Sequence, residues 1–138
     1  MEEFEKLLGT TLQSTPLTHS RLKHIAGLAQ TTEDHISRLG MGLSLSIGSV
    51  SSEWSPDYLK NEENNSFLMK EKQLRGRTLF KEELAVWMAL VLKHQAPDDY
   101  SEWRQVMRAH WERGLQILME KALKEKDWIR TVNSCLLN

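Results

Sequence analysis

Apolar residues recur at helical spacing through the first fifty residues of the chain. Steps of three and four residues place them on one side of a helix, as in amphipathic helices that pack on a core. The three series are Phe4, Leu7, Leu8 and Leu12; Leu22, Ile25, Leu28 and Ala29; and Ile36, Leu39, Leu43 and Ile47. They predict helices over about residues 1–12, over 18–29, and from residue 31 onward.

Local signals predict where these helices begin and end. Pro16 restricts the residue before it and should stop the first segment. Thr31, with Asp34 three positions later, has the pattern of a helix N-cap and an acidic N3 partner. Gly40 and Gly42 fall inside the third predicted helix, where glycine costs stability. A close contact with a neighbouring element would explain them.

The helical pattern stops between residues 48 and 65, a stretch rich in Ser, Asn and Glu with Pro56 in its middle. This composition predicts a long surface loop, and loops of this length in compact domains are often functional. Residues 66–69 and 74–80 then predict a short β-hairpin between residues 65 and 80.

The second half has the strongest helical pattern. Its apolar positions are Phe80, Leu84, Trp87, Met88, Val91 and Leu92. Pro97 ends this helix, and Asp99 with Glu102 predicts the N-cap and N3 pair of the next one. That helix should run from Tyr100 to about Lys124, followed by a short helix from Trp128. We therefore expect a mostly α fold, a single-domain bundle of four to six helices over residues 1–138.

Composition limits the functional classes. The chain has 138 residues, 18 Lys+Arg and 19 Asp+Glu, which is enough for one core and leaves a formal net charge of −1. No apolar run approaches the roughly 20 residues that span a bilayer, and the acidic start lacks the order of a secretion signal. These features predict a cytoplasmic protein without membrane contact. A near-neutral chain can bind nucleic acid only through a local basic patch.

The usual catalytic motifs are missing from the sequence. The five histidines form no helical metal pair, and Cys135, the only cysteine, has no adjacent base. No glycine-rich phosphate loop, dinucleotide motif or nucleophile elbow occurs. We therefore expect no catalytic residue, metal site or cofactor. Trp54 lies in the polar loop, where an exposed indole more often marks an interface.

The most basic dozen residues, KEKQLRGRTLFK at 70–81, is called the basic segment below. Its cations are Lys70, Lys72, Arg75, Arg77 and Lys81, against the single acid Glu71. Arginine suits phosphate oxygens because its planar fork donates two hydrogen bonds. Gly76 between the arginines would let the backbone approach a partner and leave its amide free. Arg21 and Lys23 are a second choice for phosphate contacts. Composition alone favours a solvated turn.

Three segments change that balance. They are ISRLGMGLSLSIG at 36–48, LRGRTLF at 74–80 and RAHWERGLQIL at 108–118. In order and spacing they resemble the DndE family, the small subunit of bacterial DNA phosphorothioation systems, over about residues 18–123. The matching positions are Arg38, Leu39, Gly40, Leu43, Ser44 and Leu45; Leu74, Gly76 and Leu79; and His110, Arg113, Gly114 and Leu118. The family's TGLTPN before its second helix is AQTTED here, which keeps the capping chemistry but loses Gly and Pro.

The resemblance implies a non-catalytic subunit that binds double-stranded DNA, nicked DNA included, while sulfur replaces a phosphate oxygen. It also implies a homo-oligomer, specifically a tetramer, that works with sulfurtransferase and ATPase subunits. His110, Arg113 and Gly114 are expected to hold the fold or a subunit contact and not to catalyse. Two alternatives remain open: a nickase or endonuclease, and an assembly protein without DNA contact.

Overall fold

The structure, a computed structural model, describes residues 2–62 and 69–136 and no side chains for residues 2–4, so the predicted role of Phe4 lies outside it. Its elements are α1 (Glu2–Gly9), β1 (Thr11–Gln13), α2 (Pro16–Ala29), α3 (Glu33–Ile47), β2 (Gln73–Arg75), α4 (Gly76–Phe80), α5 (Leu84–Leu92), α6 (Tyr100–Glu125) and α7 (Trp128–Leu136). The prediction of a mostly α fold is confirmed. The part of the chain described here has seven helices, one above the predicted range.

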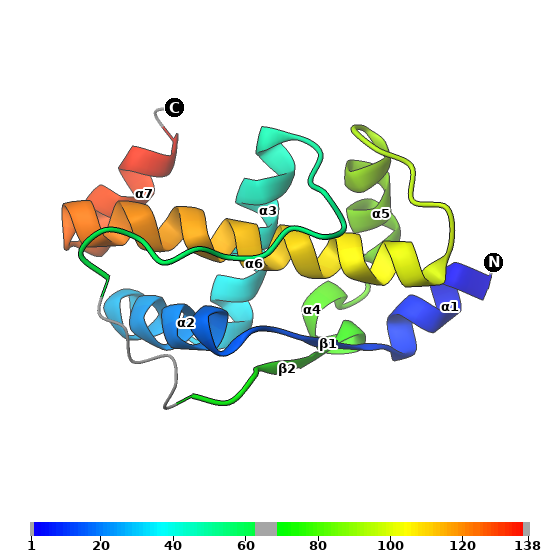
Figure 1. The fold of residues 1–138 in the computed structure, drawn as a ribbon, viewed down its shortest axis with the longest axis horizontal. Helices are drawn as coiled ribbons and strands as arrows, with labels where there is room; N and C mark the ends of the chain where they lie inside the picture. The colour runs from blue at the N-terminus through cyan, green and yellow to red at the C-terminus, as the bar shows by residue number, and fades with distance from the viewer. Residues whose placement is uncertain (1, 63–68, 137–138) are drawn as a thin grey trace.

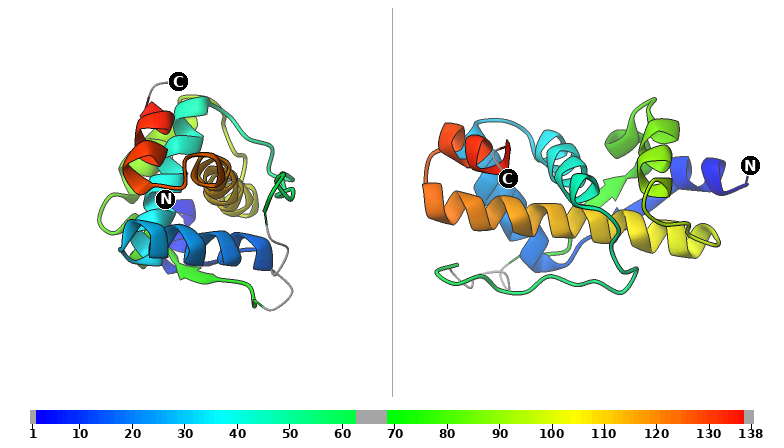
Figure 2. Two further views of the ribbon diagram at one scale, coloured as in Figure 1. Left: turned by 90° about the vertical axis from the view of Figure 1, so that its left-hand side faces the viewer. Right: turned by 90° about the horizontal axis from the view of Figure 1, so that it is seen from above.

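Helix α6 is the axis of the molecule (Figure 1). Its 26 residues span about 39 Å at 1.5 Å per residue. Helix α3 crosses α6 in the most extensive contact between two elements, and α7, α2 and α1 also pack on α6. Helices α3, α5 and α7 lie on one side of α6, and the segment 48–62 runs along the other side (Figure 2). None of the described helices is long and apolar enough to cross a membrane.

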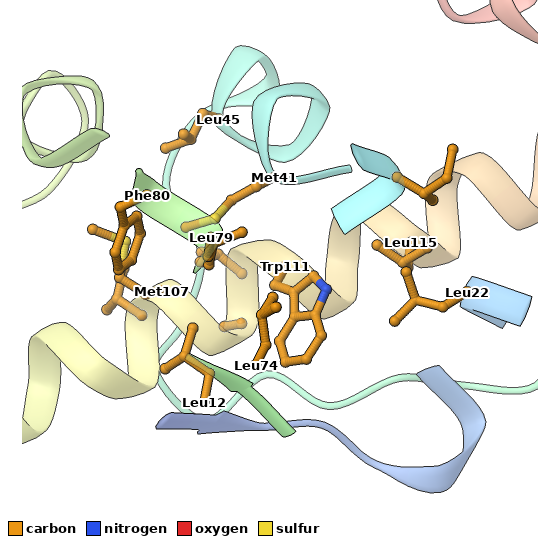
Figure 3. Packing of buried hydrophobic residues seen from close by; sticks show 14 of the residues in the cluster. Leu12, Leu22, Met41, Leu45, Leu74, Leu79, Phe80, Met107, Trp111 and Leu115 are labelled. Atoms are coloured by element: carbon orange, nitrogen blue, oxygen red, sulfur yellow. The ribbon is translucent and has the colours of Figure 1, made fainter. Parts of the chain in front are cut away.

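The core forms where the short elements meet α6. Trp111 of α6 is fully buried and donates from Nε1 to Ser37 Oγ at 3.0 Å. Leu12 of β1 and Leu74 of β2 contribute to this cluster, which Figure 3 shows around Trp111. The first predicted helix ends at Gly9, so Leu12 belongs to a strand instead. It remains a core residue.

Two glycines set the distance between α3 and α6. A Cβ on Gly114 would overlap the carbonyl group of Gly40, and a Cβ on Gly40 would lie 2.6 Å from Leu115 Cδ2. The backbones therefore touch at this crossing, where any side chain would push the helices apart. The close contact expected for Gly40 is confirmed, and Gly114 holds the fold as predicted. Gly42 has nothing within 4 Å of its Cβ position, so that part of the prediction is wrong.

Two helix starts differ from the prediction. Thr32, not Thr31, is the N-cap of α3, and its side chain accepts from the amide of His35 at 3.3 Å. Helix α2 begins at Pro16, because proline has no amide proton and fits the first helical position. For α6 the prediction is confirmed: Asp99 Oδ1 accepts from the amide of Glu102 at 2.9 Å.

The second arm of the predicted β-hairpin pairs with a strand from the start of the chain. Strand β2 pairs antiparallel with β1, with Leu12 opposite Leu74. Of the predicted arm 66–69, residues 66–68 lie outside the described residues. The second arm is extended only over Gln73–Arg75, since residues 76–80 form α4. The predicted helix from residue 80 is likewise interrupted, because Lys81 adopts a left-handed φ of 55° and separates α4 from α5.

Candidate nucleic-acid interface

The β1–β2 sheet places two residues of the basic segment, Gln73 and Arg75, on the surface. Leu12 and Leu74 are directly opposite and buried, so their neighbours point outward by the two-residue alternation of strands. Arg75 and Gln73 of β2 are exposed, as is Gln13 of β1. Thr11, opposite Arg75, is half-buried. The sheet thus has one apolar face on the core and one polar outer face that carries a single cation, Arg75.

Gly76 serves the fold and not a ligand. Its amide donates to the carbonyl of Thr10 at 2.8 Å. A Cβ at this position would overlap the carbonyl oxygen of Leu7 at the end of α1. The expectation of a free amide and a close approach to an outside partner is therefore wrong. Glycine is needed here because the start of α4 lies directly against α1.

Lys72 and Lys23 converge on one carboxylate, that of Glu33 at the start of α3. Lys72 Nζ lies 3.2 Å from Glu33 Oε1, and Lys23 Nζ lies 3.6 Å from Oε2. His19 adds Nε2 at 3.5 Å from Oε1, while its Nδ1 donates to the carbonyl of Lys70 at 2.7 Å. The structure thus brings Lys23, a second-choice residue, beside the basic segment. Glu33 compensates part of this positive charge.

Arg77 and Lys81 form a second group, one helical turn apart around α4. Both are exposed, and they line a shallow hollow of about 490 Å³ with Glu82 and Glu83. Within the described residues, no hydrogen bond or ion pair engages the side chains of Arg75, Arg77 or Lys81. These cations are therefore free to meet an outside anion. The two acids make the hollow itself nearly neutral.

Arg21 is not available to DNA, and its assignment as a DNA-binding residue is wrong. Its side chain is fully buried. Its guanidinium donates twice to the carboxylate of Glu62 at 2.8 Å, and also to Gln116 Oε1 and the carbonyl of Asp57. These bonds tie α2 and α6 to the end of the segment 48–62. Arg21 is a structural ion-pair residue.

Ser44, His110 and Arg113 form a buried network between α3 and α6. Arg113 Nε donates to Ser44 Oγ at 2.8 Å, and the same Oγ is hydrogen-bonded to His110 Nδ1, also at 2.8 Å. Among the described residues, His110 Nε2 has no hydrogen-bond partner, although it is buried. Burial and the charges of Arg113 and His94 lower the pKa of His110 to about 4.

The network holds the fold, as predicted for His110 and Arg113. Arg113 also donates to the carbonyls of Ser44, Gly48 and Ser49 and fastens the end of α3 to α6. Burial lowers the pKa of Arg113 below its ordinary value. Ser44 and His110 are in contact like a nucleophile and its base, but both are less than 2% exposed, so no substrate can reach them.

One polar cluster was not found by sequence reasoning. Glu112 of α6 is fully buried and accepts from the amide and hydroxyl of Thr15 and from the hydroxyl of Thr18. Its other oxygen accepts from Arg108 at 2.9 Å. A cleft of about 350 Å³ opens beside it, also lined by Arg104. The i,i+4 spacing of Arg108 and Glu112 was the only signal, and it is common on solvated helices.

Comparisons with known proteins do not place this chain in a family. Scans of protein-family models, of curated proteins and of solved structures each found no significant match. Among the side chains described, those of residues 5–62 and 69–136, no three His, Cys, Asp or Glu gather as a metal ion would need. Function has to be argued from the exposed charges and the packing described above.

Proposed function

We propose that this chain is a DNA-binding, non-catalytic subunit of a DNA phosphorothioation machinery in the cytoplasm. It contacts the phosphate backbone of double-stranded DNA, nicked DNA included, through Lys70, Lys72, Arg75, Arg77 and Lys81, with Lys23 beside them. It acts as a homo-oligomer, a tetramer by the resemblance to the DndE family, and it scaffolds the sulfurtransferase and ATPase subunits.

One observation carries the DNA part of this proposal. Arg75, Arg77 and Lys81 are exposed around β2 and α4 without an intramolecular partner among the described residues. Unpaired guanidinium groups suit phosphate oxygens better than paired ones, because no internal bond must break first. Such contacts position a duplex without reading its sequence.

The small net positive charge around the basic segment of one protomer supports the proposal that the protein acts as an oligomer. Glu33, Glu82 and Glu83 lie among the cations, so one protomer holds a duplex weakly. Several copies on one duplex would add their contacts, because each further contact is made at a high effective concentration. The resemblance to the DndE family supports the link to sulfur modification.

Duplex binding measured against salt concentration tests this function. We expect unrelated duplexes to bind with similar affinity, and log affinity to fall linearly with log salt. No binding at about 50 mM salt would favour the assembly protein without DNA contact. Strand cleavage that requires magnesium, measured on the same duplexes, would favour the nickase and overturn the non-catalytic role.

A further inference from the structure

Three charged residues from separate parts of the fold meet at one end of the basic segment. Glu33 opens α3, Lys23 lies in α2, and Lys72 directly precedes β2. Lys72 Nζ lies 3.2 Å from Glu33 Oε1, and Lys23 Nζ lies 3.6 Å from Oε2. We call these three residues the Glu33 cluster. Because one carboxylate serves two ammonium groups, the cluster keeps a net positive charge.

The Glu33 cluster is held by charge and not by directed hydrogen bonds. Among the described residues, Glu33 Oε1 is enclosed without a hydrogen-bond partner, although Lys72 Nζ lies 3.2 Å away. In the same part of the chain, no hydrogen bond engages the ammonium groups of Lys23 and Lys72. Each ammonium group has three donors. These donors are therefore available to an acceptor that arrives with better geometry.

Solvent reaches the outer lysine of the cluster more readily than the carboxylate. The side chain of Lys23 is 57% exposed, whereas those of Lys72 and Glu33 are 24% and 22% exposed. Lys70, two residues before Lys72, is also exposed. An anion from solution would meet Lys23 and Lys70 first, and would reach Lys72 by displacing the carboxylate of Glu33 from it.

A DNA backbone can compete with Glu33 for these lysines. A duplex carries one negative charge per ~1.7 Å of its axis, so it can offer a separate phosphate to each lysine, whereas Glu33 offers one shared charge. Hydrogen bonds from ammonium groups to phosphate oxygens are charge-assisted and strong. The charge of Glu33 stays nearby after the exchange and opposes the phosphates. It should therefore lower the affinity and the number of counterions that binding releases.

We propose that Glu33 is an internal counter-ion of the DNA interface: duplex phosphates displace its carboxylate from Lys72 and Lys23, and this exchange limits the affinity for DNA. The inference rests on the proposed function and deepens it. Glu33 makes no contact with DNA and acts through the two lysines. The competition between its carboxylate and the phosphates sets the strength of binding at this end of the basic segment.

The affinity for one duplex, measured over a series of salt concentrations, tests the proposal. Glu33→Gln keeps the size of the side chain and removes its charge. It should raise the affinity and steepen the fall of log affinity with log salt by about one unit per bound protomer, because one opposing charge is gone. Circular dichroism should be unchanged, because the side chain of Thr32 and not that of Glu33 caps α3.

A double-mutant cycle separates displacement from a general effect of charge. Lys72→Gln should lower the affinity of both proteins, but at least about twofold more in the Glu33→Gln background than in the wild type, as expected for two residues in contact. In the wild type the lost phosphate contact is partly offset, because no pair with Glu33 has to be broken.

Glu71→Gln is the matched control background. Glu71 is an exposed acid of the basic segment, beside Lys72 in the sequence, and it has no ion pair among the described residues. Removing its charge changes the local charge by the same amount as Glu33→Gln. The loss caused by Lys72→Gln in this background should nevertheless equal the loss in the wild type.

The outcomes distinguish this inference from the proposed function. Equal losses from Lys72→Gln in the wild type and in Glu33→Gln would overturn the displacement, and so would an unchanged affinity of Glu33→Gln. If Glu33→Gln does not fold, Glu33→Asp, which withdraws the carboxylate from the lysines, should show the same coupling with a smaller size. Absence of DNA binding by the wild type and every variant would overturn the proposed function together with this inference, whereas binding without coupling overturns this inference alone.

Discussion

At the scale of single residues, the protonation of His110 should make stability depend on pH. Its pKa is about 4 in the folded protein and near 6.5 in the unfolded chain. The unfolded state therefore binds one more proton between these values, and stability falls as pH falls from 6.5 to 4. The loss should reach about 3 kcal/mol, at roughly 1.4 kcal/mol per pH unit. Urea unfolding at several pH values measures it.

His110→Asn separates this effect from the other titrating groups. The Asn side-chain amide can hydrogen-bond to Ser44 in place of Nδ1, but it takes up no proton in this pH range. The difference in unfolding free energy between the wild type and the variant should shrink or reverse below pH 6. A constant difference from pH 7 to 4 would contradict the assigned pKa of His110.

The buried ion pair of Arg21 gives a second prediction at this scale. Glu62→Gln leaves the guanidinium of Arg21 charged and enclosed, with side-chain exposures of 0% and 3% for the two partners. Removing one partner of such a pair should cost roughly 3–5 kcal/mol. Thermal unfolding measures this loss. A variant as stable as the wild type would show that Arg21 reaches solvent, and would return it to the DNA-contact candidates.

Single residues also show the limit of sequence reasoning. Arg21 stands among His19, Lys23 and His24 and looks like part of a basic surface. Its partner Glu62 is 41 residues away, so no local pattern reveals that it is buried. The structural role of Arg113 was easier to predict, because Gly114 beside it indicated a packed helix face.

At the scale of elements, the crossing of α3 and α6 should be the most sensitive part of the fold. Gly114→Ala would place a methyl group on the Gly40 carbonyl, and backbone atoms cannot move aside as a flexible side chain can. We expect a loss of roughly 1–3 kcal/mol in unfolding free energy from overpacking.

Gly42→Ala is the matched control, since Gly42 lies in α3 with open space at its Cβ position. Alanine is the better helix former, so this variant should gain up to about 1 kcal/mol. Equal effects of the two substitutions in chemical denaturation would mean that the helices are not in contact at Gly114.

Helices and strands could be predicted from the sequence where the signal lies in neighbouring residues. The cap of α6 at Asp99 is a short-range hydrogen bond and was found. The partner of β2 was not found, because Leu12 and Leu74 are 62 residues apart in the sequence. Strand pairing depends on such distant contacts, and three-residue strands carry too little alternation to reveal them.

At the scale of the whole molecule, the mostly α fold class could be predicted from the spacing of apolar residues. The way in which the other helices pack around α6 could not. In the apolar series predicted for the helix from residue 80, Phe80, Leu84 and Val91 are buried but Leu92 is exposed, and so are the apolar residues Val86 and Leu90 outside the series. Periodicity reports that a face is apolar and not whether the same chain covers it. The same limit applies to the basic segment: its exposed cations are now placed, and their partner stays a prediction.

The central claim is that the basic segment contacts DNA phosphates, and salt dependence of a charge-neutralised variant tests it most directly. The variant is Arg75→Gln with Arg77→Gln, and the matched control is Arg130→Gln, an exposed arginine on α7. Affinity for one duplex is measured at several salt concentrations, after circular dichroism and sedimentation have confirmed fold and mass. The double variant should lower the slope of log affinity against log salt by roughly one to two units per bound protomer, and the control should leave it unchanged. An unchanged slope in the double variant would contradict the account and make the basic segment a solvated turn.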